Sequence, residues 1–227
     1  LSDPAAPSLV DTFTVYMVND VSAQGDYLYI SHHYDDISIY DISARTNPQQ
    51  LKTYTITPAE VSRPETPAEI VFLDNYAYVS GTIFGISVVD VADPTAPEMT
   101  THLSMNGGVN VLYVDGTYVY AGGQDGGLHV INAQTPAAPA LTGSYRRLGG
   151  PHSIDLQGDT AYLSSGGFHL VDVSDPTAPQ QTGYHAINNL KIAGAYGYRI
   201  TQTSDPGGTL EVYDVATDST RLEPYSQ

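Results

Sequence analysis

The stretch GFHLVDVSDPTAPQQTGY, residues 167–184, contains an apolar run, an Asp-Pro pair, a second proline and a polar run. Nearly the same text, GISVVDVADPTAPEMTTH, occupies residues 85–102. The apolar runs are rich in Val and Ile and alternate with period two, which is typical of β-strands. The Asp-Pro pair favours a tight turn, because the proline ring fixes its own φ. The duplicated text therefore predicts a repeating strand–turn–strand unit.

Two further signals show that the repeat extends over the whole chain. A Tyr-x-Tyr pair, or Thr-x-Tyr in one unit, occurs five times, with its second tyrosine at residues 29, 78, 120, 162 and 198. An apolar run follows each pair, as ISIYDI, ISVVDV, LHVINA, HLVDV and LEVYDV. The tyrosines are 36 to 49 residues apart, which is the length of one unit in many repeat architectures.

Each unit divides into four short strand-like runs, expected in the second unit at about 69–73, 76–82, 86–91 and 98–103. No segment keeps an apolar period of 3.6 residues for more than two turns, so a helical bundle is excluded. Four strands per unit, repeated five times, predict an all-β fold, a β-propeller of five four-stranded blades. We expect one domain over residues 1–227, with repeats at about 16–56, 66–104, 108–146, 150–186 and 187–227.

The ends of the chain determine how such a ring closes. Residues 1–15, LSDPAAPSLVDTFTV, resemble the end of a unit, so we expect them to supply the outer closing strand of the last blade and remove an open edge. Residues 221–227 compete for the same place. Three arrangements stay open: the tail is a linker, the N-terminal strand adds as a fifth strand, or the chain is part of a longer array.

The repeated text also resembles a known family. The strings LVDVSDPTAP at 170–179 and VVDVADPTAP at 88–97 resemble the LVIVD-repeat β-propeller family of bacterial and archaeal, mostly exported, proteins. The resemblance is specific in the second and fourth units, weaker in the third, where Asn132 replaces the aspartate, and degenerate in the first and fifth. It implies a propeller at the cell surface. It implies no shared catalytic set, so no catalytic residue is assigned.

The composition restricts the partners. The chain has 25 acidic and 8 basic residues and a formal charge of −17, which argues against nucleic acid, because phosphate binding requires clustered Lys and Arg. Apolar runs are too short to cross a bilayer. The absence of cysteine excludes disulfides and thiolate metal sites. Strong acidity, few lysines and many Thr, Ser, Gly and Tyr residues favour an extracellular or cell-surface protein.

Polar residues stand where the first strand of each unit begins. In a propeller these positions and the loops between second and third strands, such as SHHYDD at 31–36, meet at one mouth of the central tunnel. We therefore predict a ligand-binding site there, formed by Asp20, His32, Asp35, Glu69, Asn110, His152 and Asn189.

The chemistry of this set leaves several alternatives open. Carboxylate and amide oxygens suit calcium, whereas a mixture of histidine and carboxylate suits a transition metal. The same side chains also serve to hold ordered water and to satisfy backbone groups at a tunnel mouth. No cofactor is therefore certain.

Other conspicuous residues have structural interpretations. His129 and His169 occupy equivalent places in their third strands, where we expect them to fill the surface between blades. Arg146 and Arg147 form the single adjacent basic pair, which is expected to pair with carboxylates or to bind an anionic ligand.

Two functions follow. The first is an exported interaction or scaffold module that binds a protein, a polysaccharide or copies of itself through loops on a rigid ring. The alternative is a secreted polysaccharide hydrolase or lyase that uses Asp20, Glu69 or His152 at the tunnel mouth. The missing nucleophile elbow and phosphate loop favour the non-enzymatic module.

Overall fold

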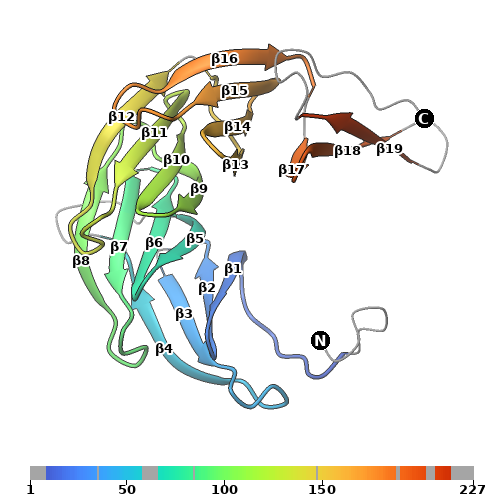
Figure 1. Ribbon diagram of the computed structural model, residues 1–227. Coiled ribbons are helices and arrows are strands. Elements are labelled where there is room, and N and C mark those ends of the chain that lie inside the picture. Colours follow the sequence, from blue (N-terminus) through green and yellow to red (C-terminus); the bar gives the residue numbers. More distant parts are fainter. Residues whose placement is uncertain are drawn as a thin grey trace.

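The computed structural model describes residues 9–34, 36–57, 66–83, 85–146, 148–187, 190–202 and 208–215. These residues form nineteen strands in five antiparallel sheets and no helix. The sheets follow one another in chain order around an arc (Figure 1). The predicted all-β fold of repeated four-stranded propeller blades is therefore confirmed, and the part described contains no helix that could cross a membrane.

Each of the first four sheets contains four strands that pair in chain order. The first sheet comprises β1 (Val18–Gln24), β2 (Tyr27–His32), β3 (Asp36–Asp41) and β4 (Gln49–Thr55). The second comprises β5 (Pro67–Leu73), β6 (Tyr76–Gly81), β7 (Gly85–Asp90) and β8 (Glu98–Ser104). The third comprises β9 (Val109–Asp115), β10 (Tyr118–Gly123), β11 (Gly127–Asn132) and β12 (Ala140–Arg146). The fourth comprises β13 (Ser153–Gln157), β14 (Thr160–Ser164), β15 (Phe168–Asp172) and β16 (Gln180–His185).

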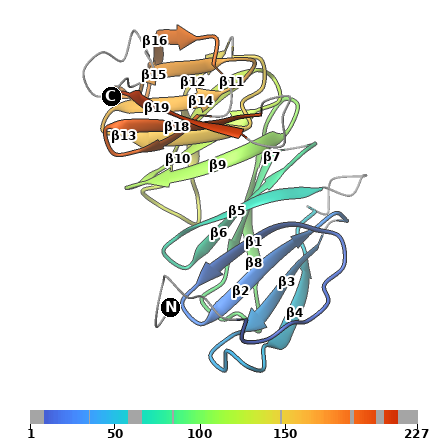
Figure 2. The ribbon, with the colours of Figure 1, turned by 90° about the vertical axis from the view of Figure 1, so that its right-hand side faces the viewer.

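The fifth sheet has three described strands, β17 (Lys191–Ala193), β18 (Tyr196–Gln202) and β19 (Gly208–Asp214). Residues 216–227, which include the predicted alternative outer strand, lie outside the described residues. In every sheet the first strand lies on the concave side of the arc, and in the four-stranded sheets the fourth strand lies on the convex side (Figures 1 and 2).

Apolar side chains fill the spaces between consecutive sheets. Four buried clusters occur, one for each pair of neighbouring sheets. The second tyrosine of the first four repeated pairs belongs to one of them, as Tyr29, Tyr78, Tyr120 and Tyr162, whereas Tyr198 of the fifth pair is 37% exposed. The repeated tyrosine is therefore an inter-sheet packing residue, and burial of its ring stabilises the stack through removal of apolar area from water.

The aspartates of the repeated text form turns. In the fourth sheet, Asp172 Oδ1 accepts the N–H of Ser174 at 2.9 Å, and Asp175 Oδ1 accepts the N–H of Thr177 at 2.9 Å and its hydroxyl at 2.6 Å. The backbone bond from Ser174 lowers the pKa of Asp172, and the hydroxyl of Thr177 lowers that of Asp175. The same bonds recur in the second sheet. These carboxylates therefore stabilise two successive turns of the backbone.

The N-terminal segment is described only from residue 9 onward. Residues 9–15 belong to no strand, although residues 1–15 were expected to form the closing strand of the last blade. The ring of Phe13 instead packs against Tyr40 of the first sheet, with 5.0 Å between ring centroids. This contact gives Phe13 an apolar partner on its own first sheet. In the part described, the first and fifth sheets are the two ends of an arc (Figure 1). Residues 1–8 and 216–227 lie outside this part, so closure of the ring by the N-terminal strand stays a prediction.

Candidate functional site

The inner strands carry a line of carboxylates, of which Asp20 on β1 is the first. Its Oδ2 accepts the N–H of Ile70 on β5 at 3.0 Å, so it connects the first sheet to the second. A shift in strand register near Asp20 turns its own N–H toward Ser31 Oγ, at 2.9 Å. Ser22 adds a bond to the carbonyl of Ile70 at 2.7 Å. Asp20 is therefore fixed by bonds within its sheet and to the next one.

Glu69 repeats this arrangement one sheet further along. Its Oε2 accepts the N–H of Leu112 on β9 at 2.5 Å, and its own N–H donates to Ser80 Oγ at 2.9 Å. Burial raises the pKa of Glu69, although the bond from Leu112 opposes this shift; the negative charge of Asp20 adds to it and the positive charge of Lys191 counteracts it. Glu69 is thus a partly desolvated carboxylate with both a negative and a positive neighbour.

The fourth sheet contributes Asp155, which the sequence analysis did not identify. Its Oδ2 accepts the N–H of Ile192 on β17 at 3.4 Å, and its Oδ1 pairs with Lys191 Nζ at 3.4 Å. Asp155 lies two residues beyond Ser153 and therefore on the same face of the strand. Asp155 lies beyond the first two positions of its inner strand, which the sequence prediction considered. The two-residue period of side chains along a strand could have indicated it.

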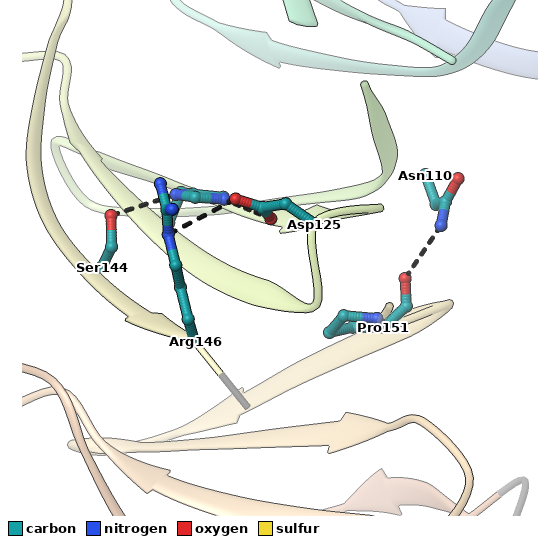
Figure 3. A network of polar contacts seen from close by, with 6 residues as sticks. Asn110, Asp125, Ser144, Arg146 and Pro151 are labelled. Atoms are coloured by element: carbon teal, nitrogen blue, oxygen red, sulfur yellow. Dashed lines mark hydrogen bonds and ion pairs between the residues drawn. The ribbon is translucent and has the colours of Figure 1, made fainter. Parts of the chain in front are cut away.

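Amide side chains near the start of the inner strands also connect neighbouring sheets. Asn19 Nδ2 donates to the carbonyl of Pro67 at 2.7 Å. Asn110 Nδ2 lies 3.5 Å from the carbonyl of Pro151 (Figure 3). The Oδ1 of Asn110 accepts a hydrogen bond from Gln124 Nε2 at 3.0 Å. These amides satisfy backbone carbonyls of the following unit.

The structure brings only part of the predicted set together. Asp20 and Glu69 lie on adjacent inner strands, and Asn110 follows on the next. His32 lies apart from them: its Nδ1 contacts the carbonyl of Tyr16 at 2.7 Å and its Nε2 contacts Ser38 Oγ at 2.8 Å. Ser31 faces the second sheet, so its neighbour His32 faces the opposite side of the strand.

The remaining predicted residues contribute less. His152 is exposed, and its backbone N–H donates to the carbonyl of Ser164 at 3.1 Å. Asp35 and Asn189 lie outside the described residues. Within the described part of the chain, no group of three or more His, Cys, Asp or Glu side chains is arranged to hold a metal ion.

A second polar network lies in the third sheet and includes Asp125 and Arg146 (Figure 3). His129 Nε2 contacts Asp125 Oδ1 at 3.0 Å, His129 Nδ1 contacts Ser144 Oγ at 3.0 Å, and Arg146 Nε lies 3.4 Å from Asp125 Oδ2. The expectation that His129 fills the surface between blades agrees with its 2% exposure. Arg146 pairs with a carboxylate, as expected, and Arg147 lies outside the described residues.

The order Ser–His–Asp in this network invites comparison with a catalytic triad. The repeat supports a structural explanation instead. In the second sheet Ser87 contacts His102 Nδ1 at 3.1 Å, and these residues are cross-strand partners just as His129 and Ser144 are. A contact that recurs at the same register satisfies buried polar groups between third and fourth strands.

Comparisons with known proteins agree with this architecture. The family model described as LVIVD repeat matches residues 17–56, 68–103, 106–147 and 149–184, which is more than half of the chain. The matches include the first unit, which the sequence analysis considered degenerate. A comparison with curated proteins found no match.

Two solved structures share the fold. The computationally designed Ika8 protein is 13% identical, with a TM-score of 0.66 over 92% of this chain and 61% of that chain. The chain thus spans about three fifths of the length of that protein. The computationally designed Ika4 protein is 11% identical, with a TM-score of 0.55 over 70% of this chain and 93% of that chain. At these identities the likeness shows the β-propeller fold alone.

Proposed function

Because this chain belongs to the LVIVD repeat family, we propose that it is a non-catalytic interaction module, exported to the cell surface, that binds a protein or a polysaccharide. The arc is a stack of sheets joined by buried apolar clusters. Such a stack is a rigid scaffold for the loops that connect the ends of its strands. Self-association of the module through its exposed sheet faces belongs to the same proposal.

One observation carries the proposal. The carboxylates of Asp20, Glu69 and Asp155 each accept a backbone N–H from the inner strand of the next sheet. A general acid or base must reach substrate with its carboxylate, whereas these carboxylates are engaged in holding the sheets together. These hydrogen bonds are best explained as contributions to the stability of the arc.

One feature favours the alternative, a polysaccharide hydrolase or lyase. Glu69 has a raised pKa and a second carboxylate, Asp20, nearby. Two neighbouring carboxyl groups, of which one has a raised pKa, are the kind of pair that glycoside hydrolysis requires. The experiment must therefore distinguish binding from cleavage.

The test measures both activities on one panel of neutral and acidic cell-surface polysaccharides. Binding is measured by co-sedimentation, and cleavage by the release of reducing ends and of unsaturated products. We expect retention without cleavage, and Glu69→Gln, whose amide oxygen can still accept the N–H of Leu112, should leave binding unchanged. Cleavage by the wild type that Glu69→Gln or Asp20→Asn abolishes would refute the proposal and establish the alternative.

Metal binding is tested separately. Calcium or a transition metal at the tunnel mouth would stabilise the native state by mass action. Thermal unfolding is measured with EDTA and then with calcium, zinc or copper restored. A fall in the midpoint that one metal reverses would support a metal site near Asp20 and Glu69. An unchanged midpoint would oppose it.

A further inference from the structure

A cavity of about 350 Å³ lies between the first and second sheets. It lies at the strand ends that carry the β1–β2 turn, so Asp20, near the start of β1, is at the other end of that strand. Its walls include Asp26, Tyr27, Tyr29, Asp41, Asn75 and Pro94. Small-molecule sites in proteins have volumes of about 300–1,000 Å³, so the space suits a small ligand group.

At the equivalent place between the second and third sheets, a hydrogen bond joins the two sheets. Tyr78, at the equivalent position of the second sheet, donates its hydroxyl to the carbonyl of Pro136 in the third sheet at 2.8 Å. Tyr29 and Pro94 are the corresponding residues one sheet earlier, and both line the cavity. Tyr29 is 1% exposed, and its hydroxyl has no hydrogen-bond partner among the described residues. Tyr29 therefore offers the cavity a hydroxyl that no described side chain or carbonyl occupies.

The charged and polar groups around the cavity restrict the ligand. Asp41 Oδ1 accepts the N–H of Ser43 at 2.8 Å, and the hydrogen bonds from Ser43 lower the pKa of Asp41, so this carboxylate is ionised at neutral pH. Asp26 is a second carboxylate. Its partner Arg45 lies 3.4 Å away, with both side chains 62% exposed, so this pair contributes little. No lysine, arginine or histidine is among the residues that line the cavity.

The two carboxylates of the wall disfavour anions and favour a group that donates hydrogen bonds to them. Ammonium and guanidinium groups donate and do not accept. They are also attracted to the faces of aromatic rings, and two tyrosines, Tyr27 and Tyr29, are among the residues that line the cavity. The net charge of −17 raises the local concentration of cations around the chain.

We propose that the cavity between the first two sheets binds an alkyl ammonium or guanidinium group, with Asp41 as its charged acceptor and the Tyr29 hydroxyl as a second partner. The group comes either from a free amine or from a lysine or arginine side chain of a protein partner. The site is separate from the inner-strand carboxylates and is independent of the proposed function.

The test uses calorimetric titration of the 227-residue chain at pH 7 and low salt. The probes are butylammonium and butylguanidinium, with butanol and butyrate as neutral and anionic analogues, and an acetylated, amidated Gly-Lys-Gly peptide. We expect saturable binding of at least one cation and none of butanol or butyrate. Binding of the peptide identifies a side chain as the source, and binding of the free cations alone identifies a free amine.

Variants assign the binding to the cavity. Asp41→Asn should weaken cation binding about ten-fold, because a charge-assisted bond is lost while the amide still accepts the N–H of Ser43. Asp172→Asn is the matched control, because Asp172 forms the equivalent turn in the fourth sheet without a place in this cavity. Tyr29→Phe should weaken binding about five-fold. Absence of cation binding, equal binding of butanol, or equal weakening by Asp172→Asn would overturn the proposal.

Discussion

Two tyrosines at the same position of adjacent sheets provide a direct test of the packing between blades. Tyr78 is fully buried and donates its hydroxyl to the carbonyl of Pro136 at 2.8 Å. Tyr29 is 1% exposed and lines the cavity between the first two sheets, and its hydroxyl has no hydrogen-bond partner among the described residues. The substitutions Tyr78→Phe and Tyr29→Phe therefore remove the same atom from similar surroundings, but only the first removes a hydrogen bond.

The expected cost follows from this difference. Tyr78→Phe deletes one buried hydrogen bond and leaves the carbonyl of Pro136 without its partner, which together cost about 2 kcal/mol. A change of 1 kcal/mol shifts the unfolding midpoint of a domain of this size by about 2–4 °C, so the midpoint should fall by about 4–8 °C. Tyr29→Phe should change the free energy of unfolding by less than about 0.5 kcal/mol.

Urea unfolding followed by far-UV circular dichroism measures both variants against the wild type at pH 7. Tyrosine fluorescence gives a second probe, because the chain has no tryptophan. Equal destabilisation by the two substitutions would refute the reasoning, since it would show that loss of the hydroxyl and not loss of its bond sets the cost. An unaffected Tyr78→Phe variant would refute it as well.

Further predictions concern Glu69 and Gly143. Because burial raises the pKa of Glu69 above its unfolded value, its contribution to the free energy of unfolding is greatest below the unfolded pKa and declines as pH rises through the folded pKa. Urea unfolding between pH 4 and 7 should show a smaller decline in Glu69→Gln than in the wild type, and an unchanged slope would contradict this. A Cβ on Gly143 would lie 2.1 Å from the backbone oxygen of Pro176, so Gly143→Ala should destabilise the protein by about 1–3 kcal/mol. Gly158→Asn is the control, because nothing lies within 4 Å of a Cβ there and asparagine tolerates its φ of +55°; equal midpoints for the two variants in thermal unfolding would disprove the clash.

The strand pattern was predictable because the chain repeats its own text. The second sheet was expected at about 69–73, 76–82, 86–91 and 98–103, and its strands occupy Pro67–Leu73, Tyr76–Gly81, Gly85–Asp90 and Glu98–Ser104. Turn residues and a period of two define such boundaries locally. The closing strand stays a prediction, because residues 1–8 lie outside the described part and Phe13, in the described remainder, packs on Tyr40 through its ring.

The candidate site was only partly predictable. The sequence placed Asp20 and Glu69 on adjacent inner strands, but it could not show that each carboxylate faces a backbone N–H of the following sheet. That N–H belongs to a strand about fifty residues away, and its direction depends on how the two sheets are offset. The sequence also could not show that His32 lies apart from Asp20 and Glu69, which follows from the neighbouring residue Ser31 taking the face toward the second sheet.

The arc of sheets has a consequence for how the protein unfolds. Within the described residues, each sheet contacts the sheets before and after it in the chain through one apolar cluster and a few carboxylate or amide bonds. The chain is therefore a short linear array, in which each junction acts as a nearest-neighbour coupling. Amide exchange should be slowest in β6, β7, β10 and β11, which have a sheet on both sides, and fastest in the first and fifth sheets. Heat would accordingly shorten the array from its two ends before the central sheets separate.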